Sequence, residues 1–206
     1  MRYPELSAEL VRLLEMDQGE WKKFARAEYV QKMPESELKQ LRVKLRMSLE
    51  TRAKRALAIL NEIIDPSISN IGAEAAKSLS ILATHHSRAS THKVLSAFEV
   101  LYDESPNDTY KESIPAMTDW LAILEHRPQT FGTIWLFDDK QFPFLPTVRD
   151  FKNINERRVS YGIEPLRWPK SLVIPEEEQP WLKKPITSAV MREPTSDEIS
   201  TLIDYL

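Results

Sequence analysis

Cysteine is absent from this 206-residue chain, and glycine is scarce, with four residues in all. The absence of cysteine excludes a disulfide framework, a thiolate metal site and a cysteine nucleophile. The shortage of glycine disfavours folds that are built from many tight hairpins. The chain also lacks any apolar run near the roughly 20 residues needed to span a bilayer. No membrane-spanning segment is therefore expected.

The charge pattern narrows the expected location and partners. The first residues, Met1-Arg2-Tyr3-Pro4, lead directly into a charged amphipathic pattern, without the apolar core of a secretory signal. Together with the lack of cysteine, this pattern favours a cytoplasmic location. The formal net charge of -3 and the pI near 5.9 argue against a surface built to hold nucleic acid. Nucleic acid is therefore disfavoured as a partner.

Apolar residues recur at steps of three and four along much of the chain, which is typical of packed helices. The clearest stripe runs from Leu38 to Ile64. It predicts one long helix ending near Asp65-Pro66, because proline disfavours helical geometry in the residue before it. An interruption at Asp17-Gln18-Gly19 predicts two short helices, or one bent helix, upstream. Downstream, Ser90 or Thr91 is expected to cap a further helix.

The pattern changes after Pro128. Residues 130–143 predict a short two-stranded β-ribbon closed by a polar turn. Asn153 to Tyr161 predict one more helix, with Gly162 as its C-terminal stop. The predicted fold is mainly α: a compact multi-helix domain over residues 1–168 with one small β-ribbon near 130–143.

The C-terminal segment has a different composition, with six prolines from Pro165 onward. Residues 169–206 therefore predict an extended proline-rich arm. Thr195 and Glu198 form a capping-box pattern that predicts a short helix over residues 195–206. A helix of this length is unstable alone and is expected to dock on its own domain or on another chain. The arm is thus a candidate surface for a protein partner or a homo-oligomer.

Short segments in a fixed order carry a family resemblance. They are Asp17-Gln18, Gly72, Leu82-Ala83-Thr84-His85-His86-Ser87, Met117-Thr118-Asp119-Trp120, Phe131-Gly132-Thr133-Ile134, and Arg157-Arg158 followed by Gly162-Ile163. In this order they resemble an uncharacterised bacterial family, domain of unknown function 6624, over residues 1–168. That family's pattern has Asp-Gln, Leu-x-Gln-His-Ala-Asp, Leu-Thr-Asp-Arg, Tyr-Gly-Thr-Gln and an Arg-Arg pair before Gly-Leu. The resemblance implies a helical fold and assigns no activity.

The chain departs from the family pattern at polar positions. Thr84 stands for the glutamine before the histidine, and Ser87 stands for the aspartate after it. Trp120 replaces the arginine after Asp119, and Ile134 replaces the last glutamine. These departures imply a divergent member that keeps only part of the family's polar residues.

The polar residues that match the family pattern are the candidate site. His85 and Asp119 are the candidate catalytic acid–base pair, because imidazole and carboxylate groups exchange protons readily. An arginine of the Arg157-Arg158 pair would hold an anionic group of a small ligand. The candidate substrate-binding residues are Gln18, Thr133, Arg157 and Arg158.

Each catalytic candidate also has a structural interpretation. His85 would be a solvated histidine near a helix C-terminus, favoured there by the helix dipole. Asp119 would form a salt bridge or cap a neighbouring segment. No metal site is predicted: on one unbroken helix His85 and His92 would lie too far apart to share an ion, and only a turn at Ser87 to Ser90 could bring them together. No cofactor is predicted either. Walker loops, dinucleotide fingerprints and serine elbows are absent, which removes the largest familiar classes of nucleotide enzyme and hydrolase.

Two functional hypotheses follow. The first is a small-ligand-binding protein or an enzyme with a polar pocket around His85, Asp119 and Arg158. The alternative is a non-catalytic interaction or oligomerisation module that uses the C-terminal arm or the basic long helix. The cations of that helix, between Lys39 and Arg55, could contact phosphates, could form a solvated face, or could pair with acidic residues elsewhere in the chain.

Overall fold

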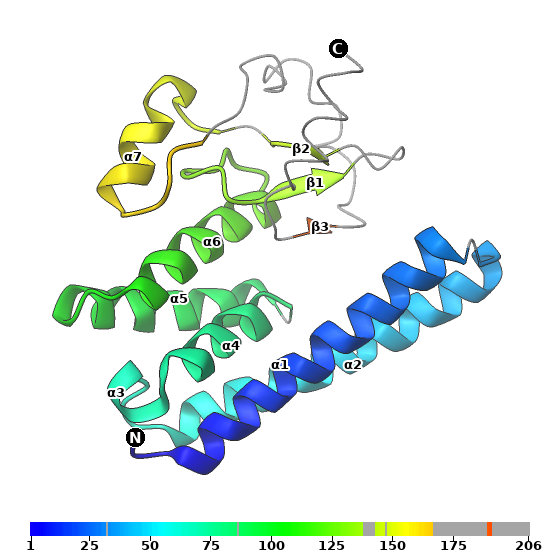
Figure 1. Cartoon of the computed structure of the whole chain (residues 1–206), viewed down its shortest axis with the longest axis horizontal. Helices are drawn as coiled ribbons and strands as arrows, with labels where there is room; N and C mark the ends of the chain where they lie inside the picture. Colours follow the sequence, from blue (N-terminus) through cyan, green and yellow to red (C-terminus); the bar gives the residue numbers. More distant parts are fainter. Residues whose placement is uncertain (32, 86, 138–142, 147, 167–188, 191–206) are drawn as a thin grey trace. The chain divides into compact units, whose positions relative to one another are not determined.

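Helices dominate the computed structural model (Figure 1), which confirms the mainly α fold expected from the apolar periodicity. The structure describes all residues except 32, 86, 138–142, 147, 167–188 and 191–206. Its contacts divide the chain into two units, Met1–Ser113 and Ile114–Leu206. Of the described helices, none is long and apolar enough to cross a membrane.

Unit 1 begins with two long helices that run antiparallel, α1 (Pro4–Ala25) and α2 (Glu35–Glu62), joined by a π-helical turn at Arg26–Val30 (Figure 1). Of the two alternatives predicted around Gly19, two separate helices are wrong, since α1 continues through this residue as one helix. One glycine costs a helix only about 1 kcal/mol, which packing along the rest of α1 offsets. The end of α2 at Glu62 agrees with the stop predicted near Pro66.

The outer part of this helical hairpin has a small core of its own. Trp21 and Phe24 of α1 meet edge to face, with ring centroids 6.1 Å apart. Three leucines of α2, at positions 38, 45 and 49, are buried in the same cluster. The apolar stripe of α2 therefore packs on α1, as its periodicity predicts.

The rest of unit 1 is a set of shorter helices: α3 (Ile68–Ile71), α4 (Ala73–Thr84), α5 (Arg88–Glu104) and the beginning of α6 (Asp108–Leu124). Helix α4 packs against α1, α2 and α5. The cap predicted at Ser90 or Thr91 is wrong, because α5 begins earlier. Its N-cap is Ser87, whose hydroxyl accepts a hydrogen bond from the Ser90 amide at 3.2 Å.

Unit 2 contains the rest of α6, which continues through Pro115, and the helix α7 (Ile154–Ser160). Strand β1 (Trp135–Phe137) pairs antiparallel with β2 (Pro143–Phe144) and with β3 (Ala189–Val190). A turn of 3-10 helix, η2 (Phe151–Asn153), precedes α7. The core of this unit consists of Trp135, Leu145, Val148, Ile154 and Leu166.

Two predictions for the C-terminal half lie partly or wholly outside the described residues. The turn of the predicted β-ribbon falls within residues 138–142, so the ribbon as a whole stays a prediction. The arm predicted over residues 169–206 is described only at Ala189–Val190, and its terminal helix 195–206 lies outside the described residues. The predicted domain boundary near residue 168 therefore also stays a prediction.

Candidate functional site

A buried carboxylate and a histidine meet in unit 1. Asp17 lies in the middle of α1 with 0% of its side chain exposed, while His85 follows the last residue of α4 and is 15% exposed. The distance from His85 Nδ1 to Asp17 Oδ2 is 3.0 Å, which makes an ion pair when the ring is protonated, and neither atom has a hydrogen-bond partner among the described residues. The packing of α4 on α1 brings these two side chains together. Each of these two buried polar atoms therefore has the other as its neighbour of opposite charge when the ring is protonated.

The second oxygen of Asp17 contacts a buried arginine of α2. Arg52 Nε lies 3.4 Å from Asp17 Oδ1, and Arg52 also donates to Glu20 at 2.8 Å and to Ser48 at 2.7 Å. The hydrogen bond from Arg52 holds the pKa of Glu20 below its ordinary value. A guanidinium with several acceptors keeps a fixed orientation, because its donors lie in one rigid plane. Arg52 thus fixes the carboxylate that faces His85.

This arrangement determines which imidazole nitrogen is free to react. An ionised carboxylate only accepts hydrogen bonds, so the contact with Asp17 favours the tautomer that carries its proton on Nδ1. The opposite nitrogen, Nε2, is then an unprotonated base in the neutral ring. A histidine oriented by a carboxylate in this way is suited to proton transfer. The pair can therefore perform general acid–base chemistry on a group that reaches Nε2.

Asp119 makes a different set of contacts in unit 2. It is completely buried, and its carboxylate accepts hydrogen bonds from the amides of Thr130 at 2.7 Å, Phe131 at 3.0 Å and Thr133 at 2.8 Å. The Thr133 hydroxyl donates a fourth, at 2.8 Å. Burial raises the pKa of Asp119, while the hydrogen bonds from Phe131 and Thr133 act in the opposite direction. The carboxylate thereby shapes the loop that follows α6.

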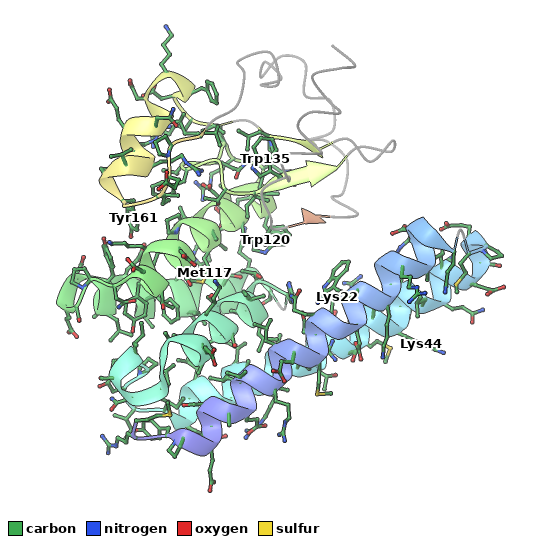
Figure 2. The ribbon with its side chains drawn as sticks, in the orientation of Figure 1. Lys22, Lys44, Met117, Trp120, Trp135 and Tyr161 are labelled. Atoms are coloured by element: carbon green, nitrogen blue, oxygen red, sulfur yellow. The ribbon has the colours of Figure 1, made fainter. Side chains whose placement is uncertain are left out.

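The two arginines of α7 contact the same loop through its carbonyl groups. Buried Arg158 donates to the Phe131 carbonyl at 2.9 Å and to the Glu164 carbonyl at 2.7 Å. Arg157 donates to the Thr130 carbonyl at 3.0 Å. Tyr161, labelled in Figure 2, packs edge to face on Phe131 with ring centroids 5.3 Å apart. Side chains therefore bind both kinds of backbone group in the loop at residues 130–133: Asp119 accepts from its amides, and Arg157 and Arg158 donate to its carbonyl groups.

The structure places the predicted site residues in two groups. Asp119, Thr133, Arg157 and Arg158 come together around the loop at residues 130–133 of unit 2. His85 and Gln18 belong to unit 1, where Gln18 is exposed on α1 next to Asp17. Their catalytic and substrate-binding roles stay predictions.

Sequence reasoning did not assign Asp17 or Arg52 to the site. Both residues lie on apolar helical stripes. A charged residue within such a stripe is the sequence signal that could have identified them. Asp17 falls in the series Leu10, Leu14, Asp17, Trp21, Phe24, and Arg52 falls in the series Leu45, Leu49, Arg52, Ala56. A charged residue at a core position needs a partner, so each one indicates a buried polar contact.

The basic stripe of the long helix is largely compensated by acids. Arg42 pairs with Glu28 and Glu35, and Arg46 pairs with Glu50. Further along α2, Arg55 pairs with Glu9 at 2.7 Å and with Glu62 at 2.8 Å. These contacts match the interpretation in which the stripe pairs with acidic residues elsewhere in the chain. Each of these three guanidinium groups already has an anionic partner.

Among the described residues, no three histidine, aspartate or glutamate side chains are grouped so that they could hold a metal ion. No family model, curated protein or solved structure matches this chain. The contacts of the side chains are therefore the basis for assigning a function.

Proposed function

We propose that this protein is a small-ligand-binding protein or an enzyme whose reacting group is the His85 imidazole, oriented by Asp17. The observation that carries this proposal is the 3.0 Å contact between His85 Nδ1 and fully buried Asp17 Oδ2. Burying a carboxylate is costly unless it is paired, and Asp17 is paired by buried Arg52 on one oxygen and by a partly exposed imidazole on the other. The partial exposure of His85 leaves a path for a ligand.

The proposal replaces Asp119 by Asp17 as the acidic partner of His85. Asp119 accepts hydrogen bonds from three amides and one hydroxyl of its own unit, which use its acceptor positions. Arg158 likewise donates to backbone carbonyls of unit 2. These contacts favour structural roles for both residues. Asp17 and His85, by contrast, leave the Nε2 side of the ring for chemistry.

The ligand class follows from the charge of the reacting group. A protonated imidazole stabilises an adjacent anion, and a neutral one removes a proton from an adjacent acid. The fitting ligand is therefore a small molecule with a carboxylate, a phosphate or an acidic hydroxyl. Both Asp17 and His85 also lie in segments that resemble domain of unknown function 6624. Membership of that family is part of this proposal.

The first test is the tautomer of His85, measured by long-range proton–nitrogen NMR on protein labelled with nitrogen-15. The wild-type ring in its neutral form should carry its proton on Nδ1. In Asp17→Asn the carboxylate is lost, so a mixture of tautomers is expected. His92, an exposed histidine of α5, provides the control signal, which should be the same in both proteins. An Nε2-protonated ring in the wild type would contradict the proposed orientation.

The second test concerns binding. A thermal-shift screen of small carboxylates and phosphates would identify ligands, and calorimetry would then compare the wild type with His85→Gln and Asp17→Asn. We expect binding to weaken at least about tenfold in each variant, equivalent to about 1.4 kcal/mol, and to remain unchanged in the control His92→Gln. Equal affinity in all four proteins would exclude His85 as the ligand-contacting group.

A further inference from the structure

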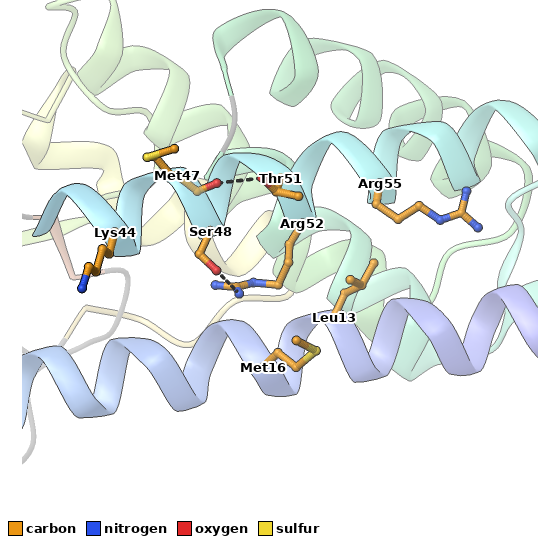
Figure 3. A pocket seen from close by; sticks show the side chains of 8 residues that line it. All are labelled: Leu13, Met16, Lys44, Met47, Ser48, Thr51, Arg52 and Arg55. Carbon is orange, nitrogen blue, oxygen red and sulfur yellow. Dashed lines mark hydrogen bonds between the residues drawn. The ribbon is translucent and has the colours of Figure 1, made fainter. Parts of the chain in front are cut away.

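A groove of about 640 Å³ lies between α1 and α2 (Figure 3). Leu13 and Met16 line it from α1, and Met47 and Thr51 line it from α2. Arg52 extends from α2 toward α1 (Figure 3). The groove is therefore a strip along two antiparallel helices, and Arg52, which also contacts Asp17, is part of its lining.

The groove leaves large apolar side chains exposed. Met16 is 52% exposed and Met47 is 64% exposed, which is unfavourable for unbranched apolar side chains in water. Methionine is flexible and polarisable, and it is common at surfaces that receive the apolar face of another helix. A helix laid along the strip would bury both thioethers and convert the pair into a three-helix arrangement.

Charge selects the kind of helix that fits. The lining includes three cations, Lys44, Arg52 and Arg55, and no carboxylate. Arg52 and Arg55 are already paired with glutamates, but within the described part of the chain no carboxylate forms an ion pair with Lys44. Lys44 lies in the half of α2 nearer the turn Arg26–Val30, the same half of the hairpin as Lys22 of α1 (Figure 2). An acidic side chain is therefore favoured there.

A second cation without a direct ion pair among the described residues, Lys23, lies on the face of α1 that carries Met16. Lys23 follows Met16 by seven residues, which is two turns of helix and the same face. Among the described residues it has no direct ion pair, although it acts on Glu20 electrostatically. Lys23 and Lys44 both lie toward the turn Arg26–Val30, relative to the two methionines. Along the groove, the apolar lining is therefore followed by positive charge in the direction of the turn Arg26–Val30.

We propose that this groove binds an acidic amphipathic helix of a partner protein. Apolar side chains spaced by three and four residues would enter between Leu13, Met16 and Met47. Carboxylates one or two turns further along the partner helix would meet Lys44 and Lys23. This order of apolar and acidic residues fixes the direction of the bound helix, and a basic helix is disfavoured by like charge.

The experiment uses the full chain and two synthetic peptides about four helical turns long. Both peptides carry leucine at the same positions of one face. The remaining positions are mainly glutamate in one peptide and mainly lysine in the other. Fluorescence anisotropy of the labelled peptides should show that the glutamate peptide binds at least about tenfold more tightly than the lysine peptide. Equal binding of the two peptides, or no binding of either, would overturn the proposal.

Variants locate the binding surface. Met47→Glu and Lys44→Glu should each weaken binding of the glutamate peptide at least about tenfold. Val100→Glu is the control, since Val100 is 58% exposed on α5 and does not line the groove. It should change the affinity less than about twofold. Because all three side chains are exposed, circular dichroism should report the same fold in each variant.

Light scattering distinguishes a partner helix from a second copy of this chain. The proposal expects the same mass for the wild type and Met47→Glu. A dimeric wild type that becomes monomeric in Met47→Glu would show that a second copy occupies the groove, and the proposal would then be wrong. A loss of peptide binding in Val100→Glu as large as in Met47→Glu would have the same consequence.

Discussion

At the scale of single residues, four buried charged side chains organise the two units. Asp17 and Arg52 contact each other across α1 and α2, while Asp119 and Arg158 bind opposite polar groups of the loop at residues 130–133. Removing one partner from such a contact costs more than the contact contributes, because the remaining group stays buried without compensation. The loss of stability on substitution at these positions therefore measures their structural roles.

Asp119→Ala should destabilise the protein by about 2–4 kcal/mol. The change leaves the amides of Thr130, Phe131 and Thr133 without their acceptor, and each buried unsatisfied donor costs about 1–3 kcal/mol. Urea denaturation followed by circular dichroism measures the loss. Thr118→Ala is the control, because the Thr118 hydroxyl donates only to the Ile114 carbonyl of its own helix. A loss for Asp119→Ala no larger than that for the control would show that the loop does not depend on this carboxylate.

At the scale of elements, the helix boundaries were predictable where a local chemical signal exists. Proline at position 66 marks the end of α2, and Gly162, with a φ of +75°, marks the end of α7. The π-helical turn at Arg26–Val30 has no such signal. The start of α5 was misplaced because several hydroxyl residues lie in succession, and only the three-dimensional contact identifies Ser87 as the cap.

The candidate site was predictable only in part. His85 was identified because histidine is the common acid–base residue, but its partner Asp17 lies 68 residues earlier in the chain. The packing of α4 on α1 brings the two together, and no local pattern encodes that packing. Similarly, the hydrogen bonds from the loop amides to Asp119 depend on how the chain turns after α6. Residue type suggested the candidates, whereas tertiary contacts determine their partners.

Two glycines should respond in opposite ways to replacement by alanine. Gly132 has a φ of +65°, and an added Cβ would lie 2.9 Å from Ile154 Cδ1, so Gly132→Ala should destabilise by about 1–3 kcal/mol. Gly19 lies inside α1, and an added Cβ meets nothing within 4 Å. Gly19→Ala should therefore stabilise by about 0.5–1 kcal/mol. Thermal unfolding of both variants beside the wild type measures the two shifts, and shifts of the same sign would contradict this account of α1 or of the loop.

At the scale of the whole molecule, acidic residues of α1 make the free energy of unfolding depend on pH. Hydrogen bonds from Arg55 and from Arg52 hold the pKa values of Glu9 and Glu20 below their ordinary values. A carboxyl whose pKa is lowered by folding stabilises the folded state above its ordinary pKa. This contribution disappears as the pH falls through the lower, folded-state pKa, because the protonated group no longer attracts the guanidinium. The α1–α2 hairpin should therefore be a main point of acid sensitivity.

Glu20→Gln tests this connection. At pH 7 the variant should be less stable than the wild type, because it lacks the ionised partner of Arg52. As the pH falls below the ordinary range of glutamate and through the lowered, folded-state pKa of Glu20, the wild-type carboxylate becomes protonated and the difference between the two proteins should shrink. Urea denaturation at pH 7, 5, 4 and 3 measures the free energy of unfolding of both. Glu15→Gln, a change at an exposed glutamate of the same helix, should follow the wild type throughout. A stability difference that stays constant with pH would mean that Glu20 acts through its shape or neutral hydrogen bonds, and the ion pair with Arg52 would then contribute nothing to folding.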